Sequence, residues 1–298
     1  MDEPEAKRRI RRLRDLNTDD ILRAAGMERA AQTIPELRRL FDLPAGILAR
    51  WLDDFDQAVF RDGAARAAAT LLARLDQGVE PRGARLLTEG PRLFVANHPG
   101  LGDVLALLAR LDQPDLRIVA RDRAFLRALP SLSQSLLVVP PTGASGVLRA
   151  AEEHLAGGGA VLTFPGGRIE PDPAWFDPSP SWITWSGSTG VLARRVKGLK
   201  VQPCLVAGVR TKAFVDPWVA RWRRRPDDRE WTAAVLQLAV QVLFRRRTSP
   251  ITVSLGEPLD ATLWARSSAG AGDAALRQSL TFLTSWRRCG NVTAGGGP

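Results

Sequence analysis

The chain has 298 residues, of which 45% are hydrophobic and 25% are charged, and this composition is that of a folded globular protein rather than a disordered or fibrous one. Two cysteines are too few for the disulfide framework of a secreted domain, and two histidines are too few for most zinc sites. The formal charge of +10 favours polyanionic partners, such as an anionic bilayer or a nucleic acid, without choosing between them.

The N-terminal residues do not have the pattern of an export signal. Residues 2–14 are rich in charge and contain no apolar segment, so we expect a protein that is not exported and works in a reducing compartment. The longest uncharged stretch, 128–148, is interrupted by three prolines and two glycines and is not expected to form a spanning helix. These patterns predict a cytoplasmic protein that is soluble or peripheral on a membrane.

The sequence pattern of residues 1–80 predicts an N-terminal helical domain. An apolar stripe recurs at every fourth position, as in a helix with one buried face. The stripe consists of Ile47, Trp51, Phe55 and Val59. Thr33 and Glu36 have the spacing of a capping box, and Pro44 predicts a turn between two helices. A further helix is predicted over 64–75.

From residue 91 the pattern changes to short apolar runs separated by helix-like stretches. The runs are 93–96, 116–120, 136–139, 160–164 and 201–207, and helix-like stretches such as 104–111 and 146–155 lie between them. Strands that alternate with helices are typical of a parallel sheet covered on both faces. We therefore predict an α/β fold over 81–260, with a mostly parallel central sheet flanked by helices. A C-terminal helix and a flexible tail are predicted over 261–298.

One loop that follows a predicted strand combines a histidine with an acid. The run 93–96 leads directly into Asn97-His98-Pro99-Gly100-Leu101-Gly102-Asp103, after which a helix is predicted. Ligands of open α/β sheets bind at the carboxyl ends of the strands. A carboxylate that accepts a hydrogen bond from one ring nitrogen fixes the tautomer of a histidine and leaves the other nitrogen free to take a proton. Taken alone, the pair also fits a loop histidine beside a helix-start acid.

A second loop follows the run 160–164 and reads Pro165-Gly166-Gly167-Arg168-Ile169-Glu170. Two glycines at a strand end leave backbone N–H groups unshielded, and Arg168 adds a forked cation, so the loop suits a phosphate. On its own, Pro-Gly-Gly is also an ordinary turn.

Together, and in this order, these segments resemble the glycerolipid acyltransferase family, which includes glycerol-3-phosphate and 1-acylglycerol-3-phosphate acyltransferases. The family's first block is Asn-His, four residues and Asp (the His-x4-Asp motif), and Asn97, His98 and Asp103 match it. Its fourth block, a strand with a proline, is similar to 201–206, and a small-residue helix precedes it at 187–196. The resemblance extends roughly over 83–259.

The remaining blocks depart from the family pattern. The third, Phe-Pro-Glu-Gly, is matched by Phe164, Pro165 and Gly167, but Gly166 stands where Glu is usual, so that carboxylate is missing or supplied by Glu170. Arg168 lies one place earlier than the usual arginine. The second block is only loosely represented by 121–130, and the arginine expected after 136–139 is absent. An acceptor with another lysolipid head group is therefore an alternative.

The resemblance implies transfer of a fatty acyl group from a thioester of coenzyme A or acyl carrier protein to a hydroxyl of a glycerol phosphate or lysophospholipid. His98 would be the general base and Asp103 would orient it. The residues expected to line the substrate site are Asn97, Gly100, Phe164, Pro165, Gly166, Gly167, Arg168 and Glu170. Arg168 and the amides of Gly166 and Gly167 would hold the acceptor phosphate. No metal or prosthetic group is expected, since the acyl thioester is a co-substrate.

Basic and aromatic residues outside these blocks allow two interpretations. Trp218 and Trp222, set among four arginines, fit either a membrane surface or a packed core, and the basic runs 7–14 and 245–247 are equally open. We expect an anionic membrane surface as a partner. A nucleic-acid binder is disfavoured because no motif supports it, and a catalytically silent lipid-binding relative is a third alternative. His154 is interpreted as a surface histidine.

Overall fold

The structure is a computed structural model that describes residues 3–141, 143, 145–215, 226–244, 249–265 and 270–290. The first half of the chain contains α1 (Glu3–Ala25), α2 (Glu28–Thr33), α3 (Pro35–Asp62), α4 (Ala64–Arg74), β1 (Val79–Gly83), β2 (Arg92–Ala96), α5 (Asp103–Leu111), β3 (Leu116–Arg121), α6 (Ala124–Arg127), α7 (Pro130–Ser133) and β4 (Leu136–Val139). The second half contains α8 (Ser145–Ala156), β5 (Ala160–Thr163), α9 (Ser179–Trp182), α10 (Ser188–Arg195), β6 (Lys200–Ala207), η1 (Lys212–Phe214), α12 (Pro226–Phe244), β7 (Ile251–Leu255), β8 (Leu259–Asp260), α13 (Thr262–Ala265) and α14 (Ala271–Gly290).

The strands form one mixed sheet in the order β1-β7-β6-β2-β5-β3-β4, with β8 paired to β6. Strands β6, β2, β5, β3 and β4 are parallel neighbours, whereas β7 runs antiparallel to β6 and parallel to β1. The prediction of a mostly parallel sheet flanked by helices is thereby confirmed. Because β2 lies between β5 and β6, the loops that leave these three strands at their carboxyl ends meet at one edge.

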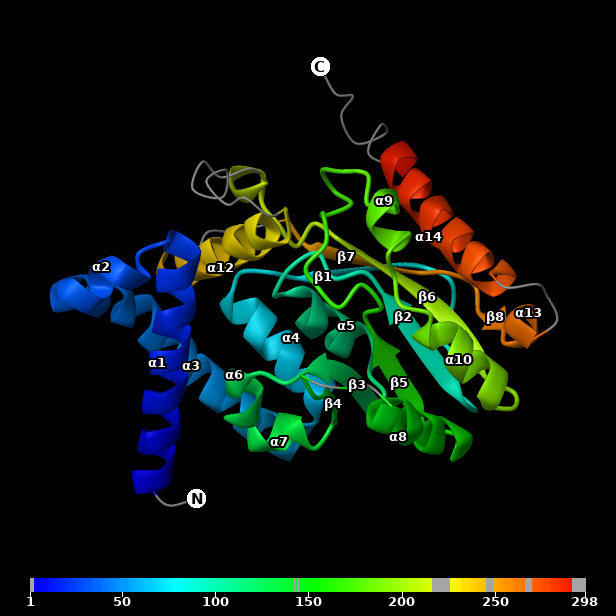
Figure 1. Ribbon diagram of the computed structural model, residues 1–298, viewed down its shortest axis with the longest axis horizontal. Coiled ribbons are helices and arrows are strands. Elements are labelled where there is room, and N and C mark those ends of the chain that lie inside the picture. The colour runs from blue at the N-terminus through cyan, green and yellow to red at the C-terminus, as the bar shows by residue number, and fades with distance from the viewer. Residues whose placement is uncertain are drawn as a thin grey trace.

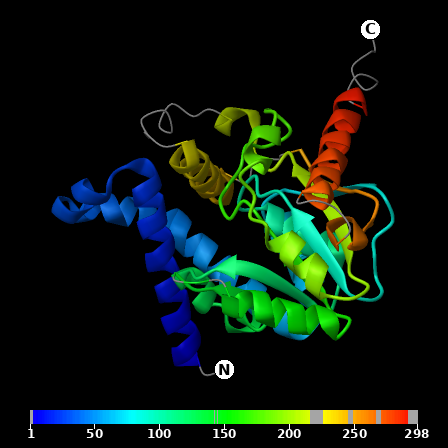
Figure 2. The ribbon, with the colours of Figure 1, turned by 45° about the vertical axis from the view of Figure 1, so that its right-hand side comes forward.

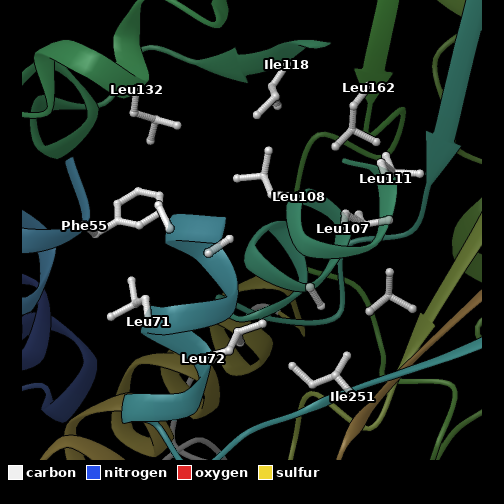
Figure 3. Close-up of a cluster of buried hydrophobic side chains, with 14 of the residues drawn as sticks. Phe55, Leu71, Leu72, Leu107, Leu108, Leu111, Ile118, Leu132, Leu162 and Ile251 are labelled. Atoms are coloured by element: carbon white, nitrogen blue, oxygen red, sulfur yellow. The ribbon is translucent and has the colours of Figure 1, made fainter. Parts of the chain in front are cut away.

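Helices cover both faces of the sheet (Figures 1 and 2). In β2, Phe94 and Ala96 contribute to one buried cluster, and Leu93 and Val95 contribute to the other. The first cluster joins the sheet to helices α3, α4 and α5, and Figure 3 shows side chains of these helices pointing toward those of β3, β5 and β7. The second cluster joins the opposite face to α8, α10 and α14. A strand covered on both faces reads as a continuous apolar run, which is why β2 and β5 were recognisable in the sequence.

The N-terminal helices share a core with the sheet. Leu13 of α1, Phe55 of α3 and Leu72 of α4 belong to the same buried cluster as Phe94 of β2. The predicted domain boundary at residue 80 falls inside β1, and α14 packs its buried leucines onto the sheet. The helical segments at both ends of the chain therefore complete the two layers that cover the sheet.

Two local predictions in the helical segment are wrong. Pro44 lies inside the continuous helix α3 instead of at a turn. A proline removes one helical hydrogen bond, but α3 packs against α1 on both sides of Pro44, through Phe41 before it and through Trp51 and Phe55 after it. This packing outweighs the local preference. The expected capping box is also absent, because Ile34 is the N-cap of α3 and the Thr33 hydroxyl donates to the carbonyls of Arg29 and Ala30.

One basic run of the sequence, 7–14, lies within the described residues. Arg9, in the basic run 7–14, pairs with Asp53 and Asp56 of α3, so part of that run is used inside the protein. The cluster 218–225, the run 245–247 and the tail after residue 290 lie outside the described residues. None of the described helices is long and apolar enough to cross a bilayer.

Candidate active site

The carboxyl end of β2 is tied to β6 by the side chain of Asn97. The amide Nδ2 donates to the Val206 carbonyl at 2.9 Å, and Oδ1 accepts from the Val206 N–H at 2.7 Å. The side chain is fully buried, and both of its polar groups are engaged by the main chain. Asn97, expected from the resemblance to contact substrate, therefore anchors the loop that carries the next residue, His98.

His98 and Asp103 are in direct contact. Asp103 is the first residue of α5, and its Oδ2 lies 2.6 Å from Nδ1 of His98 and 3.3 Å from the Gly100 N–H. Its Oδ1 accepts from the Val104 N–H at 2.7 Å. The carboxylate is fully buried and only accepts, so Nδ1 of His98 carries the proton and Nε2 presents a lone pair. The predicted geometry of the dyad is thus present.

The loop between the two residues is tightly packed. A side chain at Gly100 would begin 2.6 Å from Cγ1 of Val209, so only glycine allows this return of the chain. Gly100 therefore shapes the loop from a buried position instead of facing the solvent. The His98 side chain keeps 23% of its surface exposed and packs on the Phe164 ring, with the ring centroids 5.0 Å apart. Its Nε2 has no hydrogen-bond partner among the described residues.

The electrostatic surroundings favour the protonated form of His98. Burial lowers the pKa of the ring, but the charge of Asp103, the hydrogen bond to it and the charge of Glu170 outweigh burial and raise the pKa above its usual value. Nε2 of His98 is therefore more basic than the nitrogen of a free imidazole, and it takes up a proton more readily.

The loop after β5 differs in detail from what the sequence suggests. The buried Pro165 accepts the Ser186 N–H at its carbonyl. Gly167 adopts a φ of +60° and donates its N–H to the Phe164 carbonyl at 2.9 Å, so this amide is already used within the turn. The expectation that the Gly167 amide holds a phosphate is therefore not met in this structure. Arg168 is exposed, and its Nη2 donates to the Thr184 hydroxyl at 3.0 Å.

A second arginine, which is not among the predicted site residues, approaches the same loop. Arg121 ends β3, and its Nη2 lies 3.3 Å from the position that a Cβ of Gly167 would occupy. Its side chain is exposed, and no hydrogen-bond partner of it is found within the described residues. Sites lie at the carboxyl ends of parallel strands, and Arg121 directly follows the predicted strand 116–120. That position was the signal that could have identified it.

Glu170 is directed into the protein. The residue is 1% exposed, and its carboxylate accepts from the His98 N–H at 3.0 Å and from Nε1 of Trp185 at 2.7 Å. Its own N–H donates to the His98 carbonyl at 2.8 Å. Burial raises the pKa of this carboxyl, and the hydrogen bonds from Trp185 and from the His98 main chain oppose that rise. Glu170, expected to line the substrate site, supports the main chain of the dyad histidine.

Buried ionic groups lock the loop after β6 against the other two. Asp172 accepts from the Gly208 N–H at 2.8 Å and from the Arg210 N–H at 2.9 Å. The guanidinium of Arg210 pairs with Glu230 of α12 and donates to the Pro99 carbonyl at 3.3 Å. No local pattern marks these residues, because their partners lie far away in the sequence. They hold three loops in one arrangement around His98.

The other histidine belongs to a different part of the fold. His154 is half-buried in α8, and its Nε2 donates to the Asp115 carbonyl at 2.8 Å, so it is not the surface histidine that its sequence predicts. In the described parts of the chain, no group of three or more His, Cys, Asp or Glu residues is arranged to hold a metal ion. The described residues thus bring together an oriented imidazole and the ring of Phe164. Two exposed arginines, Arg121 and Arg168, lie next to and within the loop that follows β5.

In comparisons with known proteins, the chain resembles solved structures. The crystal structure of the 1-acyl-sn-glycerophosphate (LPA) acyltransferase PlsC from Thermotoga maritima is similar over 89% of this chain and 86% of that chain, with 18% sequence identity and a TM-score of 0.46. No model of a known protein family matches the chain, and no curated protein sequence matches it.

Proposed function

We propose that the protein is an acyltransferase that moves a fatty acyl group from a thioester to the hydroxyl of a glycerol phosphate or a lysophospholipid. The observation that carries the proposal is the hydrogen bond of 2.6 Å between Nδ1 of His98 and the buried Asp103, which leaves Nε2 as the only basic atom of the ring. The motif resemblance at Asn97, His98 and Asp103 supports it, since these residues lie together at one strand end.

In the proposed reaction the substrate hydroxyl is the nucleophile. Nε2 of His98 takes the hydroxyl proton while the oxygen attacks the thioester carbonyl carbon, and the Asp103 carboxylate stabilises the imidazolium. Collapse of the tetrahedral intermediate breaks the carbon–sulfur bond, and the proton passes from His98 to the departing thiolate. The products are an ester and a free thiol, and the enzyme returns to its starting state. Coenzyme A and acyl carrier protein both fit as the thiol carrier.

The acceptor's phosphate would meet Arg121 and Arg168. Both arginines are exposed. Arg121 is the last residue of β3, and Arg168 lies in the loop that follows the adjacent parallel strand β5. Arginine is suited to this role because its planar fork binds two phosphate oxygens at once. Arg121 would supply the cation whose usual place after 136–139 is empty in the sequence. A lysophosphatidate or glycerol phosphate is therefore favoured over an uncharged acceptor.

The long segment between β5 and α10 offers a surface for a membrane. It carries three exposed apolar residues, and in both ribbon views it lies between α12 and α14 (Figures 1 and 2). These residues are Trp175, Phe176 and Ile183, which are 43%, 38% and 76% exposed. Trp175 is held by a hydrogen bond from Nε1 to the Arg210 carbonyl at 3.0 Å. An exposed apolar segment that also carries the exposed Arg168 suits peripheral attachment to the cytoplasmic face of an anionic membrane.

A thiol-release assay tests the proposed activity. Purified wild-type protein is mixed with a long-chain acyl-CoA and lysophosphatidate, and free thiol and diacyl product are measured together. His98→Ala should abolish both, whereas His154→Asn, at the other histidine, should retain activity in proportion to its folded fraction. Full activity of His98→Ala would refute the mechanism. If the wild type is inactive but binds lipid, the catalytically silent lipid-binding alternative is favoured. If it is inactive and binds nucleic acid instead, the nucleic-acid-binding alternative is favoured.

A further inference from the structure

A second acid, Glu170, contacts the segment that carries the dyad histidine. It comes from a different strand loop and contacts the main chain of His98 on both sides: the carboxylate accepts from the His98 N–H, and the Glu170 N–H donates to the His98 carbonyl. These contacts, at 3.0 and 2.8 Å, fix the peptide groups on either side of the His98 α-carbon. Since the ring is attached to that carbon, the contacts also fix where Nε2 points.

The surroundings of Glu170 call for two acceptor oxygens. Oε2 faces the His98 N–H and Oε1 faces Nε1 of Trp185, and both neighbours can only donate. An amide at this position has one acceptor oxygen and one NH2 group, so one of the two neighbours would face a donor. A carboxylate satisfies both and adds a negative charge close to the ring that becomes cationic during proton transfer.

Gly166 leaves the space that this carboxylate fills. A Cβ at residue 166 would lie 2.9 Å from Oε1 of Glu170, 3.1 Å from its Cδ and 3.3 Å from Nε1 of Trp185. The backbone of Gly166 is not in the left-handed region, so a larger residue there is excluded by Glu170 and not by its φ angle. The glycine at 166 and the glutamate at 170 are therefore spatially linked: the absence of one side chain makes room for the other.

We propose that Glu170 is a positioning residue that aims His98 at the substrate hydroxyl, and that Gly166 is the space that this carboxylate requires. The role rests on the proposed acyl transfer for its catalytic meaning, but the contact itself is a property of the folded protein. In this proposal Glu170 supports the base and does not contact the substrate.

Glu170→Gln tests the contact with a readout that needs no activity. The chain has only two histidines, so the His98 ring is readily resolved by NMR, with His154 as an internal reference. The variant should lower the pH midpoint of His98 and speed hydrogen exchange of its N–H, with kcat reduced by about 10²-fold and KM little changed. Glu152→Gln, in a surface ion pair with Arg195, is the matched control and should behave as wild type. An unaltered His98 titration in folded Glu170→Gln would overturn the proposal.

Gly166→Ala provides a second variant, which keeps the charge of Glu170 and adds one methyl group beside it. The added Cβ should displace the Glu170 carboxylate, speed exchange of the His98 N–H and lower kcat. Gly146→Ala, at a helical glycine with open space around it, is the control and should leave both unchanged. Wild-type exchange and full activity in Gly166→Ala would contradict the proposed link. If His98→Ala retained full activity, the acyltransferase mechanism would fail, while the NMR result would still decide the role of Glu170.

Discussion

Asp103→Asn replaces the buried carboxylate by an amide of nearly the same shape, so it removes the negative charge beside His98. In the wild type, Oδ1 accepts from the Val104 N–H, and Oδ2 accepts from Nδ1 of His98 and from the Gly100 N–H. Asparagine has a single acceptor oxygen, so it satisfies the donors on one side only. If the oxygen stays on Val104, the amide donates to Nδ1 and the His98 proton moves to Nε2. If the oxygen faces His98, the NH2 group opposes the Val104 N–H in a site that is fully buried.

Both arrangements have a cost that follows from the geometry. An unsatisfied buried donor lowers the free energy of unfolding by about 1–3 kcal/mol. A proton on Nε2 removes the lone pair that acts as the base, and loss of general-base catalysis lowers kcat by about 10²–10⁴-fold, or about 3–5 kcal/mol of transition-state stabilisation. Because the Asp103 carboxylate raises the pKa of His98, and the base works only when unprotonated, the acid limb of the residual pH–rate profile should move to lower pH.

The assay is steady-state thiol release across the neutral pH range, with folding checked by circular dichroism. Asp54→Asn is the control, because Asp54 forms an exposed ion pair with Arg74, where the same substitution changes stability by less than about 1 kcal/mol. A folded Asp103→Asn protein with wild-type kcat and an unmoved acid limb would refute the assignment of Asp103 as the group that orients His98.

Three further outcomes are expected. Asn97→Ala should lower the free energy of unfolding, measured with urea, by about 1–3 kcal/mol for each main-chain group of β6 that loses its partner; an unchanged midpoint would contradict the bridging role. Arg121→Ala should raise KM for a phosphate-bearing acceptor by about 10–100-fold without affecting KM for the thioester, and equal effects on both would argue against a phosphate contact. Trp175→Ala combined with Ile183→Ala should weaken sedimentation with anionic vesicles, whereas Phe282→Ala, 66% exposed on α14, should not, and the reverse order would place the membrane surface elsewhere.

The parts of the fold and site that could be predicted are the local ones. Strands β2 and β5 are buried on both faces, so their apolar runs carry enough information to place them. His98 and Asp103 are five residues apart, and the loop that joins them is too short and too constrained by glycine to separate them. The sequence therefore supported a prediction of their contact, although the same spacing also fits a loop histidine beside a helix-start acid.

The parts that could not be predicted depend on distant partners. Strand β1 has the sequence Val-Glu-Pro-Arg-Gly, which lacks an apolar run, and it is a strand because it pairs with β7, more than 160 residues later. The carboxylate of Glu170 meets the N–H of His98 across 72 residues, and Nε of Arg210 meets the Pro99 carbonyl across 111. No periodicity records such contacts. A charged residue beside a turn of glycines looks solvent-exposed in a sequence, and only the fold shows that Glu170 is buried.

The position of β2 in the sheet explains why the loop that carries His98 is held from two sides. The loop that carries His98 is held from the β5 side by Glu170 and from the β6 side by Val206 and Arg210, all through buried contacts with its main chain or with Asn97. Arg121 and Arg168, which would meet the acceptor, are exposed, and Arg121 lies at the end of β3 instead of in the loop that carries His98. In the proposed enzyme, substitutions at Arg121 should therefore change which acceptor is used while leaving the base in place, whereas substitutions around Glu170 should lower turnover for every acceptor.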